Sequence, residues 1–183
     1  MNAPGKFSLK AGVLAAGRGE RLRSGSNNLK PLVKVGSHTL IEHVLNSMSE
    51  AGAAEVVVII NEDSLAVRDH VAAVKWPFAL HWIVETTQSS MHSFLRVVET
   101  LAEDGGDWPC LLATVDTVAG ALTCSRFIAE ARQLERVAVT LAITSPGDDE
   151  KPLLVRTAPG DSRIVAIGES AAPSDYATAG MYA

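Results

Sequence analysis

Short runs of apolar, often β-branched residues alternate along the chain with stretches in which apolar residues recur every three or four positions. The first pattern is typical of buried strands and the second of amphipathic helices. Their alternation predicts βαβ units stacked over a mainly parallel sheet. We therefore expect an α/β fold of the three-layer, Rossmann-like type, with helices on both faces of a mixed sheet. Strands are predicted at residues 11–16, 56–60, 80–84, 109–114 and 137–144.

The helix signals fall between these strands. Thr39 and Glu42 have the spacing of a capping box directly before an apolar periodic run, and Gly52 suits the end of that helix. Val74 and Leu134 continue the apolar stripes of two later helices, so we expect both side chains to be buried. The later helices are predicted at residues 64–74, 89–101 and 124–134.

The pattern changes after residue 145. Prolines and glycines there punctuate two short segments, at residues 153–156 and 164–167, as is typical of hairpins. We expect these segments to form a small antiparallel appendage near the C-terminus. Residues 178–183 read as one more strand, with neither turn nor helix after it. The chain is therefore interpreted as a single domain over residues 1–183 that lacks its natural C-terminal end.

Composition narrows the classes of function. Apolar residues make up 47% of the 183 residues, which is ample for a buried core at this size. With 16 Lys and Arg against 21 Asp and Glu, the net charge of −5 disfavours nucleic acid as a partner. Cys110 and Cys124 are too few for a disulfide framework, which favours a reducing compartment and hence the cytoplasm. The apolar runs fall far short of the ~20 residues that span a bilayer, so no membrane partner is expected, while a homo-oligomer stays open.

The most informative stretch follows the first predicted strand. There the apolar run breaks into GRGER at residues 17–21, and Lys30 follows nine positions after Arg21. Small residues let a backbone lie against a polyphosphate, and an Arg with a nearby Lys supplies the cations that such an anion requires. A G-x-G turn alone is common in α/β proteins, where it is only a tight turn with surface cations. The added Arg and Lys favour a nucleotide-binding loop.

Three segments, LAAGRGERL, LKPLVKV and GSHTLIEHVLNSM, together resemble the signature of nucleotidyltransferases of the sugar-nucleotide pyrophosphorylase type. Weaker similarity continues through SSMHSF, LLATVD and TAGMYA, so the resemblance covers nearly the whole chain. It implies an enzyme that condenses a nucleoside triphosphate with a phosphomonoester, releases pyrophosphate and uses Mg²⁺. The residues that the resemblance assigns to nucleotide binding are Leu14, Ala15, Ala16, Gly17, Gly19, Arg21, Ser89 and Ser90. The two serines also suit the N-cap of the helix predicted at residues 89–101.

The implied reaction needs positive charge more than acid or base catalysis, because one phosphate attacks another. Arg21 would hold the departing pyrophosphate through its planar guanidinium, and Lys30 would sit on the α-phosphate or the acceptor phosphate. Asp116 follows a strand at the carboxyl edge of the sheet, where a carboxylate can fix Mg²⁺ beside the α-phosphate. The predicted catalytic residues are thus Arg21, Lys30 and Asp116, with Asp116 as the metal ligand. A simple turn or helix cap is the alternative for Asp116.

The acceptor half of the site departs from the family pattern. Glu169 and Gly180 match family positions and are implied to bind the phosphorylated acceptor, a sugar 1-phosphate or a phosphocholine-like molecule. Ser170 stands where the family commonly has a Lys that grips the sugar phosphate. The family's second metal carboxylate normally comes beyond the strand predicted at residues 178–183.

Two other functions compete with this interpretation. A nucleotide-binding relative without catalysis, acting as a regulatory subunit, would explain the missing Lys and carboxylate. A dinucleotide-dependent oxidoreductase needs G-x-G-x-x-G, and Leu22 stands at the third glycine, so we exclude that class. The five histidines lack the H-x-x-x-H or Cys/His spacing of a zinc site.

Overall fold

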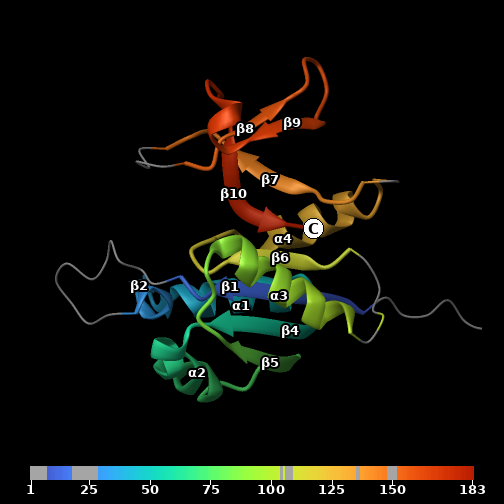
Figure 1. The fold of residues 1–183 in the computed structure, drawn as a ribbon. Coiled ribbons are helices and arrows are strands. Elements are labelled where there is room, and N and C mark those ends of the chain that lie inside the picture. The colour runs from blue at the N-terminus through green and yellow to red at the C-terminus, as the bar shows by residue number, and fades with distance from the viewer. Residues whose placement is uncertain (1–7, 18–28, 104, 106–108, 135–136, 148–151) are drawn as a thin grey trace, which may run out of the picture.

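The computed structural model describes residues 8–17, 29–103, 105, 109–134, 137–147 and 152–183. The strands of its central sheet are β1 (Leu9–Ala15), β4 (Ala53–Ile60), β5 (Ala79–Val84), β6 (Leu111–Thr114), β7 (Leu141–Thr144) and β10 (Ala177–Tyr182). Among the described residues they form a six-stranded sheet in the order β5-β4-β1-β6-β10-β7 (Figure 1). β5, β4, β1 and β6 pair in parallel, whereas β10 runs antiparallel to both β6 and β7. The predicted mixed, mainly parallel sheet is confirmed.

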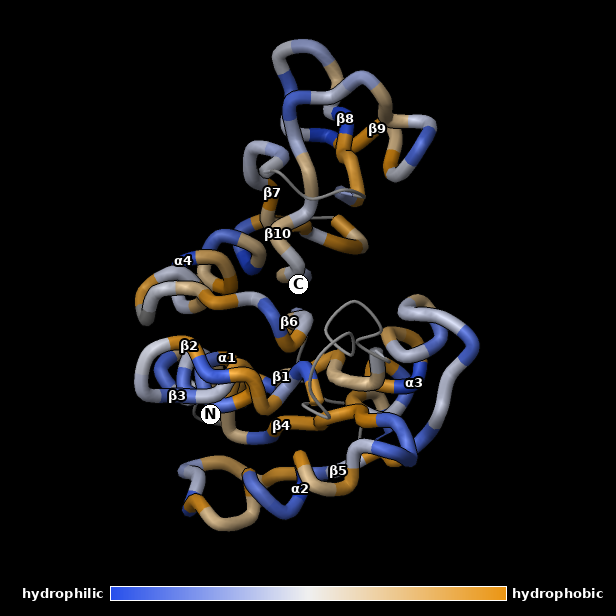
Figure 2. Tube along the Cα trace, turned by 90° about the vertical axis from the view of Figure 1, so that its left-hand side faces the viewer, coloured by the Kyte–Doolittle hydropathy of each residue, from blue (hydrophilic) through white to orange (hydrophobic). Residues whose placement is uncertain are grey.

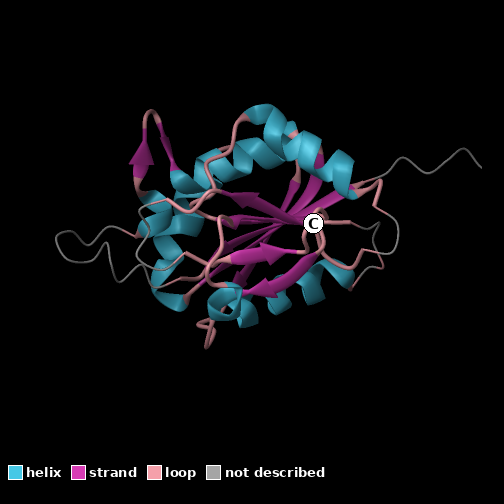
Figure 3. Cartoon of the chain, turned by 90° about the horizontal axis from the view of Figure 1, so that it is seen from above, coloured by secondary structure: helices cyan, strands magenta, loops and turns pink. Residues whose placement is uncertain are grey.

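Helices cover both faces of this sheet (Figure 3). They are α1 (Leu40–Glu50), α2 (Leu65–Ala72), α3 (Ser90–Ala102) and α4 (Ala121–Ala131). α1, α2 and α4 contribute Val44, Val67 and Ile128 to one core cluster, and α3 contributes Val97 and Leu101 to a second cluster. The predicted three-layer arrangement is therefore present. Within the described part of the chain, no helix combines the length and the apolar character needed to cross a membrane.

β4 shows how the strands separate the two cores. Val56, Val58 and Ile60 belong to the first cluster, while Val57 and Ile59 belong to the second. Successive side chains of a strand point to opposite faces, so a strand that is covered on both faces needs a continuous apolar run. The trace of β4 is accordingly hydrophobic along most of its length (Figure 2).

The capping box predicted at the start of α1 is confirmed. Thr39 Oγ1 accepts from the backbone N–H of Glu42 at 3.4 Å, and Glu42 Oε2 accepts from the N–H of Thr39 at 2.7 Å. The helix ends at Glu50, and Gly52 follows with a φ of +82°, which glycine adopts without a Cβ penalty. These local signals fix where α1 begins and ends.

Two smaller antiparallel sheets and three short 3₁₀ turns complete the secondary structure of the described residues. β8 (Val155–Thr157) and β9 (Ile164–Ile167) pair as the appendage that the Pro- and Gly-rich region predicts. β2 (Lys34–Val35) and β3 (His38–Thr39) form a second hairpin, which the sequence pattern did not predict. The 3₁₀ turns are η2 (Lys30–Leu32), η3 (Glu62–Ser64) and η4 (Gly168–Ala171).

Three predicted details are wrong. Val74 lies beyond the end of α2 and is 42% exposed rather than buried. Leu134 lies in the turn after α4 and is 49% exposed. The strand predicted at residues 137–144 begins only at Leu141. In each case apolar residues lie just outside the regular element, after its end for the two helices and before its start for the strand, and periodicity alone does not mark that boundary.

Candidate active site

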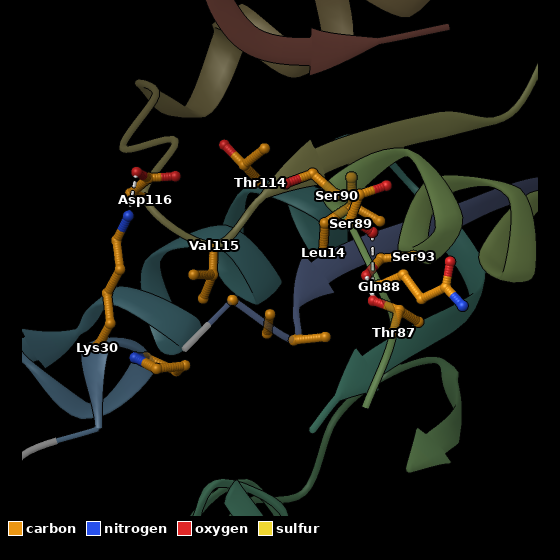
Figure 4. Close-up of a pocket in the computed structure, with 14 residues that line it drawn as sticks. Leu14, Lys30, Thr87, Gln88, Ser89, Ser90, Ser93, Thr114, Val115 and Asp116 are labelled. Atoms are coloured by element: carbon orange, nitrogen blue, oxygen red, sulfur yellow. Dashed lines mark hydrogen bonds and ion pairs between the residues drawn. The ribbon is translucent and has the colours of Figure 1, made fainter. Parts of the chain in front are cut away.

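A cavity of about 670 Å³ opens at the carboxyl edge of the parallel strands, between the ends of β1 and β6 and the start of α3 (Figure 4). β1 and β6 are parallel neighbours, with Leu14 opposite Thr114. The residues that follow the two strands, Gly17 and Asp116 among them, therefore reach the same edge of the sheet. Residues predicted from the sequence to form the site make up much of the cavity wall: Leu14, Ala15, Ala16, Gly17, Lys30, Ser89, Ser90 and Asp116.

Lys30 and Asp116 form an ion pair on this wall. Lys30 Nζ donates to Asp116 Oδ2 at 2.5 Å, and Figure 4 shows the lysine side chain extended toward the carboxylate. Lys30 opens η2, whose next residue, Pro31, is buried and holds the turn against the protein. The proline thus anchors the turn that presents the ammonium group at the cavity.

The carboxylate of Asp116 is charged at neutral pH. Burial would raise the pKa of Asp116, but hydrogen bonds from Lys30 and Thr114 and the charge of Lys30 outweigh that effect and lower the pKa below the usual aspartate value. No other acidic side chain of the described residues lines the cavity, and the same part of the chain contains no group of three or more metal-binding side chains. A single ionised carboxylate suits a cation whose other ligands come from a polyphosphate and water.

Hydroxyl groups line the α3 side of the cavity. Ser89 Oγ caps α3 by accepting from the N–H of His92 at 3.4 Å, and it also lies 2.8 Å from His92 Nδ1. Thr87 Oγ1 lies 2.6 Å from the hydroxyl of the buried residue Ser93. Ser89 therefore has the N-cap geometry that the sequence suggests, while its contact with a base or ribose stays a prediction.

Residues 11–170 match the MobA-like NTP transferase domain. The chain belongs to this family. The matched residues include Gly17, the Lys30–Asp116 pair and the start of α3. The nucleotidyltransferase resemblance seen in the sequence is thereby confirmed.

Curated relatives of this MobA-like domain are longer proteins. The bifunctional protein GlmU of Rhodopseudomonas palustris is 35% identical over 105 residues, which cover 57% of this chain and 22% of that protein. The CMP-5'-(3-aminopropyl)phosphonate synthase of Streptomyces rubellomurinus is 29% identical over 146 residues, which cover 75% of this chain and 23% of that protein. The chain thus spans less than a quarter of the length of either relative.

Solved structures of nucleotidyltransferases share the fold. UDP-glucose pyrophosphorylase complexed with UDP-glucose matches with a TM-score of 0.74 at 16% identity, over 96% of this chain and 75% of that one. The inositol-1-phosphate CTP transferase from T. maritima matches with a TM-score of 0.69 at 19% identity, over 97% of this chain and 70% of that one. At these identities the similarity concerns the fold alone, and it agrees with the Rossmann-like class expected from the sequence.

The remaining predicted site residues of the MobA-like domain are not among the described residues of the cavity wall. Gly19 and Arg21 fall outside the described residues. Glu169 lies in η4 beside the β8–β9 hairpin and Gly180 lies in β10; neither lines the cavity. Gly180 packs so closely on β6 that a Cβ there would overlap the hydroxyl of Thr114. The roles of Gly19 and Arg21 in nucleotide binding, and of Glu169 and Gly180 in acceptor binding, stay predictions.

Sequence reasoning assigned no role to several residues of the cavity wall: Pro31, Thr87, Gln88, Ser93, Thr114 and Val115. Thr87 and Gln88 directly precede the serine pair that the resemblance identifies, and Thr114 lies two positions before Asp116. The only sequence signal for a role in the site was that these residues lie close to the segments that resemble the family. It was weak because polar residues at strand ends are common in any α/β protein.

Proposed function

We propose that this chain transfers a nucleoside monophosphate from a nucleoside triphosphate to a phosphate-bearing small molecule and releases pyrophosphate. The observation that carries the proposal is that Gly17, Lys30 and Asp116 lie on one cavity wall. This wall lies at the edge where open α/β sheets bind their ligands. Membership of the MobA-like NTP transferase family supports the same class of reaction.

The proposed reaction forms one P–O bond and breaks another. An oxygen of the acceptor phosphate attacks the α-phosphorus, and the bond to the β-phosphate breaks, so that its electron pair leaves with pyrophosphate. Because both partners are anionic, the protein contributes mainly by neutralising charge and by aligning the reacting groups. The Lys30 ammonium would exchange its hydrogen bond to Asp116 for one to an oxygen of the α-phosphate or of the acceptor phosphate. Arg21 would hold the departing pyrophosphate.

Mg²⁺ is the metal that we propose, with Asp116 as its protein ligand. Asp116 is ionised, lines the cavity and bonds Lys30 through only one of its two carboxylate oxygens. In proteins Mg²⁺ is commonly held by one or two carboxylates together with substrate phosphates and water. When bound, it would supply positive charge to the triphosphate.

The nucleoside is proposed to lie against the start of α3. Ser89 and Ser90 line the cavity there, and we propose that they contact the base or the ribose. Gly19 is proposed to let the backbone approach the phosphates, because it has no side chain. The cavity volume of about 670 Å³ lies within the range of about 300–1,000 Å³ that is usual for small-molecule sites.

The acceptor is proposed to be a sugar 1-phosphate or a phosphocholine-like phosphomonoester, bound on the side of Glu169 and Gly180. Some similar proteins have names that mention both a nucleotide and a phosphate- or phosphonate-bearing compound. Two of them are inositol-1-phosphate CTP transferase and CMP-5'-(3-aminopropyl)phosphonate synthase. Those names describe those proteins, and here they support an acceptor of this chemical kind.

A cytoplasmic location is proposed as well. Cys110 and Cys124 are buried free thiols, and burial raises the pKa of Cys110 to about 11, which keeps this thiol protonated. Free buried cysteines suit a reducing compartment.

A nucleotide-binding regulatory subunit is the second candidate function. In the described part of the chain, Asp116 is the one acidic side chain on the cavity wall, and Ser170 stands where the family commonly has a Lys. Such a protein would bind a nucleoside triphosphate without turning it over.

Pyrophosphate release separates the two candidates. Each common nucleoside triphosphate is incubated with Mg²⁺ and a panel of phosphomonoesters. An enzyme should show turnover that falls about a hundredfold in Asp116→Asn, since one charge-stabilising contact in a transition state is worth about 2–4 kcal/mol. Asp69→Asn is the matched control, because the Asp69 side chain is 75% exposed on α2. Nucleotide binding without pyrophosphate release would favour the regulatory subunit, and absence of binding would contradict both candidates.

A further inference from the structure

The buried amide of Asn61 holds the backbone just beyond the end of β1. Asn61 directly follows β4 and is only 3% exposed. Its Nδ2 donates to the carbonyl oxygen of Ala16 at 3.1 Å, and its Oδ1 accepts from Ser64 Oγ at 2.7 Å. A carbonyl oxygen accepts but never donates, so the nitrogen of the Asn61 amide is the end that faces Ala16. Both ends of the amide are therefore bonded and its orientation is fixed.

The carbonyl of Ala16 does not point where a continuing strand would direct it. In an extended strand the carbonyl groups of successive residues point to opposite neighbouring strands. The Leu14 carbonyl faces the β6 side, where it accepts from the N–H of Val115 at 3.1 Å. Regular alternation would turn the Ala16 carbonyl to that side again, but it is bonded instead to Asn61, which follows the strand on the other side of β1. The peptide between Ala16 and Gly17 is thus rotated out of strand geometry.

This rotation also determines where the next N–H points. A trans peptide is planar and its C=O and N–H are opposed, so the N–H of Gly17 points away from Asn61, toward the side of β1 on which Asp116 lies. The N–H of Ala16 still follows the regular alternation of β1, which directs it to that same side. Ala16, Gly17 and Asp116 all line the cavity. Successive N–H groups that face one side form a concavity that binds anions.

We propose that Asn61 is a positioning residue, whose amide sets the Ala16–Gly17 peptide so that both N–H groups face the polyphosphate of the nucleotide. This role rests on the proposed function, which assigns the polyphosphate to this cavity. Asn61 itself does not line the cavity among the described residues, so it acts through the backbone and not by touching the ligand.

Calorimetric titration with inorganic tripolyphosphate and with nucleoside triphosphates, both with Mg²⁺, tests this role. Asn61→Asp and Asn61→Ala both remove the donor to Ala16; the first keeps the shape of the side chain and the second adds no charge. We expect each variant to bind both ligands with an affinity lower by about tenfold or more, which is the scale of one charge-assisted hydrogen bond. Ser64→Ala is the matched control, because it removes the other bond of Asn61 and leaves the donor to Ala16 in place. Its affinity should stay close to that of the wild type, although its melting temperature falls like those of the Asn61 variants.

The outcomes separate this role from the proposed function. If the wild type binds and both Asn61 variants bind with the same affinity, the positioning role of Asn61 is overturned and the proposed function still stands. A wild type that binds neither tripolyphosphate nor any nucleoside triphosphate would overturn both. If the Asn61 variants do not fold, nuclear magnetic resonance of the ¹⁵N-labelled wild type decides: the amide protons of Ala16 and Gly17 are expected to move downfield with tripolyphosphate, and unmoved resonances would overturn the role.

Discussion

Lys30 and Asp116 lie 86 positions apart in the sequence, yet Lys30 Nζ donates directly to Asp116 Oδ2 on the wall of the cavity. Their side chains are 33% and 47% exposed, so a ligand can reach both. Each group neutralises the other in the free protein. A triphosphate with its cation would offer the ammonium a phosphate and the carboxylate a metal ion, so we expect the pair to separate when the nucleotide binds.

Lys30→Met should lower kcat/KM for pyrophosphate release by about a hundredfold, because it removes a positive charge from the reacting phosphates. Lys75→Met is the matched control, since Lys75 is exposed and does not line the cavity. Equal activity in the two variants would show that Lys30 does not contact the reacting groups.

Arg21→Ala is expected to reduce turnover by about a hundredfold and Arg18→Ala by much less, because the resemblance places only Arg21 on the departing pyrophosphate. Both residues lie outside the described part of the chain, so this prediction rests on sequence spacing. The two variants differ by position alone, which makes each the control of the other. Equal and negligible losses of turnover in the two variants would contradict the assignment of Arg21 to the site.

Gly180→Ala should destabilise the fold by about 2–4 kcal/mol, from a left-handed backbone and from overpacking. Gly180 has a φ of +75°, and a Cβ there would overlap Thr114 and lie 2.6 Å from Thr117 Oγ1. Urea denaturation measures the loss. Gly147→Ala is the matched control, because nothing lies within 4 Å of its added Cβ. Similar free energies of unfolding for the two variants would contradict the close packing of β10 on β6.

Glu42→Gln should lower stability at neutral pH by about 0.5–1 kcal/mol, because it removes a charge from the first turn of α1. Hydrogen bonding to the Thr39 backbone lowers the pKa of Glu42. A lowered carboxyl pKa contributes stability that is present above the unfolded-state pKa and is lost as the pH falls through the folded-state pKa. The difference between variant and wild type should therefore shrink below pH 4.5, the ordinary value for this group. Urea denaturation at pH 7 and pH 3 measures it, and an equal difference at both pH values would contradict the assignment.

Much of the fold could be predicted because local patterns govern it. The continuous apolar run of β4 and the Thr39–Glu42 capping box are properties of neighbouring residues, and the structure contains both. The place of β10 between β6 and β7 was not predictable in this way, because strand pairing depends on contacts between residues far apart in the chain. The ends of α2 and α4 were missed for a related reason, since an apolar residue past a helix end looks the same in sequence as one inside it.

The candidate site was predictable as far as it follows a motif. Gly17, Lys30 and Asp116 lie in segments whose composition suggests phosphate chemistry, and the fold brings them to one cavity. Asn61 carries no such signal, because an Asn after an apolar strand is an ordinary loop residue. Its bond to Ala16 joins positions 45 residues apart and becomes visible only in the structure.

A crystal structure with a non-hydrolysable triphosphate analogue and Mg²⁺ tests the central claim most directly. We predict phosphate oxygens against the backbone of Ala16 and Gly17, with Lys30 moved from Asp116 to a phosphate. A triphosphate bound away from Ala16 and Gly17, with the contact between Lys30 and Asp116 intact, would contradict the claim.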